Sequence, residues 1–192
     1  MNFIFDIGNV LINYQPLQFL EKLLNDTPLA KKVFHIIFRC PEWEQLDQGL
    51  LSHKEATGIF CMREPDYAPA IRKSMQNLND MFTPVPASIE TLTKIKDAGH
   101  NLYLLSNIHT EIKDYLLKKH EFFSLFCGGV FSCDVHVTKP ACEIYRLLLE
   151  KYSLPPEDCL FFDDSEKNVA AAEKEGIKSI HFSGSSCIKP FI

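Results

Sequence analysis

Short apolar runs that end in polar residues recur along this chain, with helical patterns between them. This alternation is typical of a parallel β-sheet whose strands are joined by helices. The runs predict strands at residues 2–5, 101–105, 129–131, 160–162 and 179–182. Apolar residues at helical spacing predict helices at 87–98, 140–152 and 165–175, the first and last halted by glycine. The region from Thr83 onward therefore reads as four βα units of an α/β, doubly wound parallel sheet.

The interval between the first strand and the second is too long for a simple crossover connection. Its apolar residues fall at helical spacing, and Ser52 to Glu55 carries the capping-box pattern that opens helices. The prolines at 84 and 86 favour an extended return to the sheet. We therefore predict a small helical bundle inserted after the first strand, which divides the chain into a core of residues 1–14 and 83–192 and a bundle of residues 15–82.

Within the bundle, aromatic side chains are expected to pack against one another, and these are Tyr14, Phe19, Phe38 and Trp43. The segment 43–51, with Gly49 as a tight-turn residue, is a candidate to overhang a site at the edge of the sheet.

Composition narrows the range of partners. A length of 192 residues suits one globular core with a modest insertion. The formal net charge of -5 and the short Lys/Arg pairs argue against nucleic acid as the main partner. No apolar run approaches membrane-spanning length, and the first residues read as a strand. The seven scattered cysteines, with no C-x-x-C pair, are expected to stay reduced. These features predict a cytoplasmic protein that binds neither nucleic acid nor membrane.

Polar residues follow the predicted strands, at Asp6, Ser106-Asn107, Lys139 and Asp163-Asp164. In an open parallel sheet, ligands bind beyond the carboxyl ends of the strands. A carboxylate can attack phosphorus to form an acyl phosphate, while a hydroxyl and a lysine hold the phosphoryl oxygens. Further carboxylates suit a hard cation such as magnesium. The set predicts an enzyme that hydrolyses small phosphorylated metabolites.

Four segments resemble, in order and spacing, the motifs of the haloacid dehalogenase superfamily. They are Phe5-Asp6-Ile7-Gly8-Asn9-Val10-Leu11, Leu105-Ser106-Asn107, Lys139-Pro140 and Phe162-Asp163-Asp164-Ser165-Glu166-Lys167-Asn168. The resemblance spans essentially the whole chain and places the helical insertion where that superfamily carries a cap domain. The Asp-x-Gly-Asn-Val variant and compact cap look most like the branch of sugar-1-phosphate phosphatases such as α-D-glucose-1-phosphate phosphatase.

The resemblance implies a role for each matching residue. Asp6 would be the nucleophile and a ligand of Mg²⁺, and Gly8 would offer the metal its backbone carbonyl. Ser106 and the amide of Asn107 would bind the phosphoryl group, which Lys139 would neutralise while orienting Asp6. The remaining roles fall on the last motif: Asp164 as direct metal ligand, Asp163 either sharing that role or supporting Lys139, and Asn168 as a brace.

One position departs from the pattern of the superfamily's phosphatases. They carry a second aspartate two residues after the nucleophile, which transfers a proton to the leaving oxygen, and here that position is Gly8. General acid–base catalysis contributes roughly 10²–10⁴-fold. His109 and His53 are possible substitutes, and a good leaving group, such as a sugar anomeric oxygen, would lessen the need for the acid.

Two other activities are compatible with the motifs. A metal-independent 2-haloacid dehalogenase also lacks the second aspartate, but adjacent acids facing a nucleophilic carboxylate argue for a cation between them. A regulatory protein could keep the phosphate pocket and lack turnover.

Overall fold

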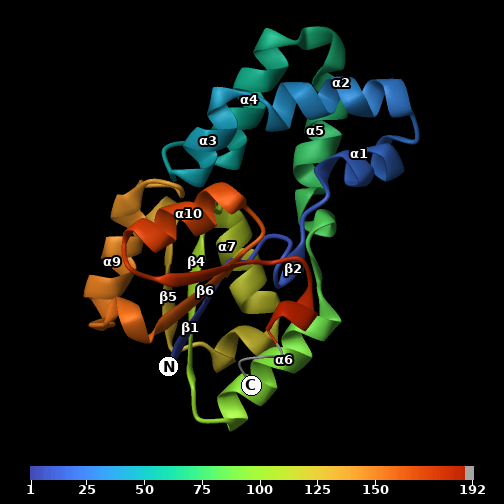
Figure 1. Cartoon of the computed structure of the whole chain (residues 1–192). Coiled ribbons are helices and arrows are strands. Elements are labelled where there is room, and N and C mark those ends of the chain that lie inside the picture. Colours follow the sequence, from blue (N-terminus) through green and yellow to red (C-terminus); the bar gives the residue numbers. More distant parts are fainter. Residues whose placement is uncertain (189–192) are drawn as a thin grey trace.

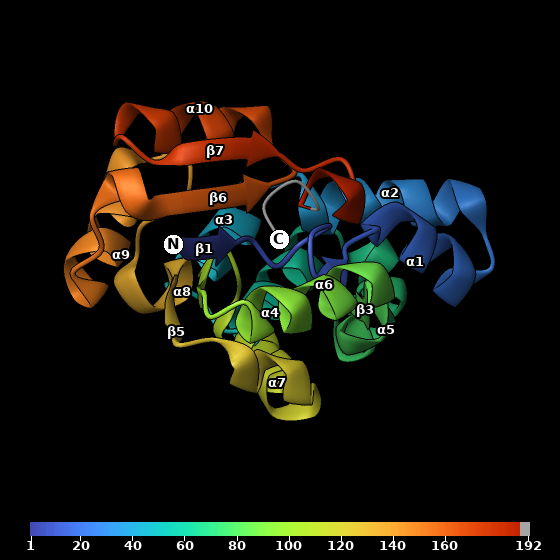
Figure 2. The ribbon, with the colours of Figure 1, turned by 60° about the horizontal axis from the view of Figure 1, so that its bottom comes forward.

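The computed structural model describes residues 1–188, and its centre is a five-stranded parallel sheet. The strands lie in the order β5-β4-β1-β6-β7. Figure 2 shows β7, β6, β1 and β5 following one another down the view. Their bounds are β1 (Asn2–Phe5), β4 (Asn101–Ser106), β5 (Gly128–Phe131), β6 (Cys159–Asp163) and β7 (Lys178–His181). All five strands predicted from the apolar runs are confirmed, each to within one residue at either end.

Helices cover both faces of this sheet, because alternate residues of a strand point to opposite faces. Phe3 and Phe5 of β1 share one apolar cluster with Leu92 of α6 (Pro86–Asp97) and Leu116 of α7 (Thr110–Lys119). Ile4, between them, belongs to the opposite cluster. That cluster includes residues of α9 (Cys142–Tyr152) and α10 (Glu166–Lys174). The doubly wound α/β architecture predicted from the sequence is confirmed.

Five further helices lie beyond the carboxyl ends of the strands (Figure 1). They are α1 (Pro16–Leu24), α2 (Thr27–Phe38), α3 (Pro41–Asp47), α4 (His53–Arg63) and α5 (Ala68–Gln76). They bury an apolar cluster of their own, formed by Leu20, Val33, Ile37, Phe60 and Ile71 among others. We call this group the helical unit. The helices fall within the range predicted for the inserted bundle, and the predicted capping box of Ser52 and Glu55 is present at the start of α4.

Two chain segments join the helical unit to the sheet, and they lie side by side. β2 (Ile12–Asn13) pairs antiparallel with β3 (Thr83–Pro84). The Asn13 side-chain amide donates to the backbone oxygen of Thr83 at 3.2 Å and to its hydroxyl at 3.0 Å. The entry to the helical unit and the exit from it are therefore held together at one point.

The remaining elements are short. α8 (Ser132–Val135) follows β5, and single 3₁₀ turns occur at Pro65–Tyr67, Leu78–Met81, Glu121–Leu125, Pro156–Asp158 and Ser185–Cys187. Two helices, α3 and α7, were not predicted from the sequence, and α9 starts two residues later than predicted. Between residues 1 and 188, no helix combines the length and apolar character needed to cross a membrane.

Candidate active site

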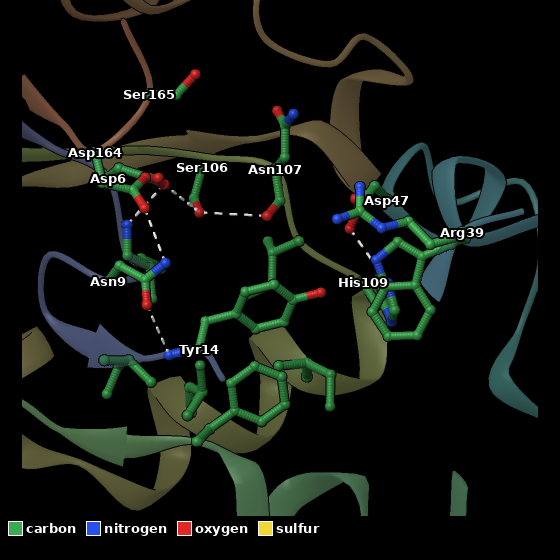
Figure 3. Close-up of a pocket in the computed structure, with 18 residues that line it drawn as sticks. Asp6, Asn9, Tyr14, Arg39, Asp47, Ser106, Asn107, His109, Asp164 and Ser165 are labelled. Atoms are coloured by element: carbon green, nitrogen blue, oxygen red, sulfur yellow. Dashed lines mark hydrogen bonds and ion pairs between the residues drawn. The ribbon is translucent and has the colours of Figure 1, made fainter. Parts of the chain in front are cut away.

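The four predicted motifs meet at the carboxyl edge of the sheet. Asp6 directly follows β1, Ser106 ends β4 and Asp163 ends β6, so the central strand and both its neighbours contribute. Lys139 reaches the same place from the loop between α8 and α9. We call Asp6, Ser106, Lys139, Asp163 and Asp164 the reactive cluster, part of which is drawn in Figure 3.

All hydrogen bonds found for the Asp6 carboxylate involve one of its two oxygens. Its Oδ1 accepts from the backbone N–H of Ile7 at 2.7 Å and from the Ser106 hydroxyl at 2.8 Å, and lies 2.9 Å from the Lys139 Nζ. Within residues 1–188 no hydrogen-bond partner contacts Oδ2. The carboxylate is thus fixed through one oxygen and presents the other to the site.

Lys139 is a buried cation between two carboxylates. Its Nζ donates to Asp163 Oδ2 at 2.6 Å and to the backbone oxygen of Leu105 at 2.8 Å, besides contacting Asp6. Burial alone would lower the pKa of Lys139, but the charges of Asp6 and Asp163 raise it above its usual value. Lys139 is therefore held in its charged form.

The two oxygens of Asp163 are occupied by N–H donors. Besides Lys139, they accept from the Ser165 backbone N–H at 2.8 Å and from the Asn168 amide at 3.0 and 3.1 Å. Asp163 is completely buried. This arrangement suits a residue that positions Lys139, and Asn168 braces it as expected.

Burial raises the pKa of Asp6 to about 6, and the charge of Asp163 acts in the same direction while Lys139 opposes both. Asp6, Asp163 and Asp164 can each place one oxygen within 4.8 Å of the others. Three carboxylates against the single Lys139 ammonium leave the cluster with excess negative charge. A cation would offset that excess.

Asp164 is held differently from Asp163. Its Oδ2 accepts from the Asn9 side-chain amide at 2.8 Å, and its backbone oxygen lies 3.0 Å from His181 Nε2. Asn9 has a φ of 52°, a left-handed conformation that asparagine tolerates better than most residues. The loop after β1 therefore supports the acidic loop after β6. Sequence reasoning gave Asn9 no such role.

Asn107 lies beside the cluster, but its side chain faces the backbone of Lys139. Its Nδ2 donates to the Lys139 carbonyl at 3.0 Å and its Oδ1 accepts from the Lys139 N–H at 2.8 Å. The side chain thereby fixes the Lys139 loop against the end of β4, which leaves the backbone of Asn107 for any phosphoryl contact.

A second polar group, which we call the junction cluster, joins the helical unit to the core and consists of Asp47, His53, His109 and Glu111. The ring of His109 is 3% exposed; its Nδ1 lies 3.0 Å from His53 Nε2 and its Nε2 lies 3.2 Å from Asp47 Oδ1. The His53 backbone N–H donates to Glu111 at 2.8 Å. Burial, together with the neighbouring His109, lowers the pKa of His53 to about 4.

Backbone contacts next to this cluster fix the same junction. The Ser132 hydroxyl donates to the Asp47 carbonyl at 2.5 Å, and His136 Nδ1 lies 2.7 Å from the Gln48 carbonyl. Gly49 has a φ of 67°, and a Cβ there would lie 2.3 Å from the Cys133 carbonyl oxygen. The tight turn predicted at Gly49 is confirmed, and it lets the helical unit approach α8 closely.

Each cluster contributes residues to the wall of one cavity of about 900 Å³ between the helical unit and the sheet: Asp6, Ser106 and Asp164 from the first, and Asp47 and His109 from the second. Figure 3 shows Asp6 and Asp164 on one side of it and Arg39, Asp47 and His109 on the other. The aromatic residues were only partly predicted. Phe38 packs on Trp43 as expected, with centroids 4.3 Å apart, but Trp43 and Tyr14 also line the cavity. Trp43 falls in the segment 43–51 that was a candidate to overhang the site, whereas no pattern in the sequence marked Tyr14.

The family model for haloacid dehalogenase-like hydrolases matches residues 1–176. Among curated relatives, a sesquiterpene phosphatase from Aspergillus oryzae is 24% identical over 95% of this chain and 89% of its own length. A phosphorylated-carbohydrate phosphatase from Thermotoga maritima is 26% identical over 93% of this chain and 82% of its own. A drimenol cyclase from Aspergillus calidoustus is 27% identical over 93% of this chain, which spans only 33% of that longer protein.

Solved structures share the fold. A family enzyme from Bacteroides thetaiotaomicron, in complex with magnesium and inorganic phosphate, aligns with a TM-score of 0.71 and 22% identity over 93% of this chain and 92% of its own. A dehalogenase in an intermediate complex aligns with a TM-score of 0.75 and 16% identity over 100% and 96%. At these identities the likeness concerns the fold alone.

Proposed function

The chain belongs to the haloacid dehalogenase-like hydrolase family and is a phosphatase, and we propose that it hydrolyses a small phosphate monoester with magnesium, through an aspartyl phosphate on Asp6. The observation that carries the proposal is the asymmetry of Asp6. Three donors hold Oδ1, while Oδ2 has no hydrogen-bond partner within residues 1–188. A carboxylate fixed in this way keeps one oxygen ready to attack phosphorus.

The acidic residues fit a magnesium ion. Their oxygens can approach one another within 4.8 Å, and hard cations prefer oxygen ligands. Because Asp163 already accepts from Lys139, Ser165 and Asn168, we assign the ion to Asp6, Asp164 and the backbone carbonyl of Gly8. When bound, magnesium would neutralise the phosphoryl oxygens and the surrounding carboxylates. The magnesium in the Bacteroides structure supports the choice of this metal.

In the proposed reaction Asp6 Oδ2 attacks phosphorus, an O–P bond forms, and the bond from phosphorus to the alcohol oxygen breaks. The Ser106 hydroxyl and the Lys139 ammonium, which contact Asp6 Oδ1 in this structure, would turn these hydrogen bonds toward the phosphoryl oxygens when substrate binds. Water then attacks phosphorus, releases phosphate and restores the Asp6 carboxylate. The Ile7 N–H would keep its bond to Oδ1 during both steps, which keeps the attacking oxygen aligned.

The leaving oxygen must still gain a proton, and Gly8 has no side chain to supply it. The histidines suggested as substitutes are poorly placed. Both ring nitrogens of His109 already contact a side chain, Nδ1 that of His53 and Nε2 that of Asp47. His53 is not among the residues that line the cavity. The geometry therefore favours a substrate whose alcohol leaves readily, or proton transfer from water.

The alcohol part of the substrate is the less determined half of the proposal. The Thermotoga relative supports a sugar phosphate, the prediction made from the sequence, whereas the Aspergillus oryzae relative is named for an apolar terpenoid.

The cytoplasmic location predicted from the sequence remains part of the proposal. Its support is that all seven cysteines, including Cys187 near the end of the described residues, are free.

Hydrolysis of p-nitrophenyl phosphate tests the proposal. We expect activity that requires magnesium, is removed by a chelator and is lost in Asp6→Asn, while Asp97→Asn, an exposed carboxylate on α6, keeps wild-type activity. The substitution at Asp6 preserves shape, so circular dichroism should be unchanged.

Two other outcomes would favour the alternatives. Halide release from 2-chloropropionate without metal would favour a dehalogenase, an activity that the excess negative charge of the cluster opposes. Phosphate binding without turnover would favour a regulatory protein.

A further inference from the structure

The cavity leads from the reactive cluster to a wall of aromatic and aliphatic side chains. Tyr14 and Phe82 form its first part, with ring centroids 6.1 Å apart and planes inclined by 22°. Ile112 and Leu116 of α7 continue the wall. The cavity is therefore the space beside Asp6 that can receive the alcohol of a bound phosphate ester.

The aromatic pair sits on the rigid connection between the two parts of the molecule. Tyr14 directly follows β2 and Phe82 directly precedes β3, and Asn13 ties these two strands together through Thr83. The Tyr14 N–H also donates to Asn9 Oδ1 at 3.1 Å. The pair therefore keeps its place relative to the loop that carries Asp6, and a substrate would meet it as a preformed surface.

Gly8 places this surface next to the reacting group. The nearest atom to a Cβ built at Gly8 is Cβ of Tyr14, 3.9 Å away. An aspartate at this position would lay a carboxylate between the reactive cluster and the aromatic pair. With glycine there, the carbon atoms next to the leaving oxygen face an apolar side chain instead of a charged one.

Most polar side chains around the cavity already have partners. Asn9 donates to Asp164, and its oxygen accepts from Tyr14 and Gln15. Asn107 is paired through both polar atoms with the backbone of Lys139, and both nitrogens of His109 are bonded. The hydroxyls of a sugar would thus find few free donors or acceptors here, and burying a polar group without a partner opposes binding.

Arg39 and Asp47 retain polar atoms, but they lie across the cavity from Asp6 (Figure 3). Tyr14 lies between the two sides: it borders Gly8, and the charges of Asp47 and Arg39 both act on its hydroxyl. The alcohol of a small substrate would reach Tyr14 before it reached either charged residue.

We propose that the natural substrate is the phosphate monoester of an apolar alcohol, with an alkyl or aryl group packed on Tyr14 and Phe82. This inference rests on the proposed phosphatase function and concerns only the alcohol. Contact with the pair would remove apolar surface of both partners from water, which provides the binding energy.

The test compares esters of primary alcohols, none of which is an activated leaving group: hexyl phosphate and benzyl phosphate against glucose 6-phosphate and glycerol 1-phosphate, all with magnesium. We expect kcat/KM for the apolar pair to be higher by about tenfold or more, a typical gain from apolar pocket contacts. Phe82→Ser should reduce this preference by about tenfold, mainly through KM for hexyl phosphate. Met62→Ser, which removes an apolar side chain that is 78% exposed on α4, serves as the matched control.

The outcomes separate this inference from the proposed function. Equal or higher kcat/KM for glucose 6-phosphate or glycerol phosphate would overturn the inference and leave the phosphatase function standing. Failure to hydrolyse any ester, p-nitrophenyl phosphate included, would overturn both. If Phe82→Ser does not fold, Phe82→Leu replaces it. The ratio of kcat/KM for the apolar esters to kcat/KM for the polar esters, measured on the wild-type protein, tests the inference without either variant.

Discussion

The reactive cluster and the junction cluster both contribute residues to the wall of the same cavity, yet they are built in different ways. The reactive cluster is assembled by the sheet: Asp6, Ser106 and Asp163 end three adjacent strands, whose register fixes how the side chains meet. The junction cluster spans two separately packed parts of the molecule, with Asp47 and His53 on the helical unit and His109 and Glu111 on the core. The first depends on local strand geometry, and the second depends on how the helical unit docks.

The clusters also differ in charge. The reactive cluster keeps a buried ammonium between carboxylates, because Asp6 and Asp163 raise the pKa of Lys139. In the junction cluster, burial favours the neutral form of His53. We therefore expect changes in the reactive cluster to affect chemistry and folding together, and changes at the junction to affect stability alone.

The largest effect is expected from Lys139→Met. It removes the only charge that compensates Asp6 and Asp163 within the described residues, which costs about 3–5 kcal/mol when a buried ion pair is broken. Hydrolysis should fall by roughly 10³-fold, since phosphoryl stabilisation is lost too. Urea unfolding and steady-state kinetics measure the two effects. Wild-type stability in this variant would show that the buried pair is not structurally important.

The substitution Gly8→Asp tests whether proton transfer to the leaving oxygen limits the rate. The substitution fits sterically, because the nearest atom to the added Cβ lies 3.9 Å away. If proton transfer limits the rate, kcat on an alkyl phosphate should rise by about tenfold relative to kcat on p-nitrophenyl phosphate, whose phenolate needs no acid. An unchanged ratio of the two kcat values would mean that the proton is not limiting.

The junction cluster should make stability depend on pH. The pKa of His53 lies near 6.5 in the unfolded chain and is lowered to about 4 in the fold, so the unfolded chain takes up a proton first as the pH falls. The free energy of unfolding should therefore decline from pH 6.5 toward pH 4. With 19% of the side chain exposed, we expect a decline on the order of 2 kcal/mol.

The comparison with His53→Gln isolates this effect from the other titrating groups, which include His109, Asp47 and Glu111 around the ring. The difference in unfolding free energy between wild type and variant should shrink toward low pH. A difference that is constant from pH 7 to pH 4 would contradict the account.

The smallest effect is expected from Ser52→Ala, which removes the capping box at the start of α4, next to His53. Loss of such a cap costs about 1 kcal/mol. Thermal unfolding should register this loss while kcat/KM stays unchanged. A large loss of activity would mean that the junction also controls chemistry.

The sequence predicts the sheet and the reactive cluster well for one physical reason. Asp6, Ser106 and Asp163 each follow a run of buried residues, and parallel strands bring such positions together whatever the loops do. Strand position determined Lys139 less well, because a loop separates it from its strand, and the family resemblance gave it its role.

The parts that escaped prediction depend on contacts distant along the chain. Tyr14 is of a residue type expected in a core, and only the docked helical unit makes it part of the cavity wall. The link from Asn9 to Asp164 joins residues 155 positions apart. The short helix containing Trp43 has 7 residues, about two turns, which is too short a periodic pattern to be told from a loop.

The most direct test of the central claim is to trap the intermediate on Asp6. The enzyme is mixed with magnesium and p-nitrophenyl phosphate, quenched during turnover and treated with borohydride, which reduces an aspartyl phosphate to homoserine. Peptide mass spectrometry should find homoserine at position 6, dependent on substrate and on magnesium. Turnover with unmodified Asp6, or with homoserine at another aspartate such as Asp164, would contradict the assignment of Asp6 as the nucleophile.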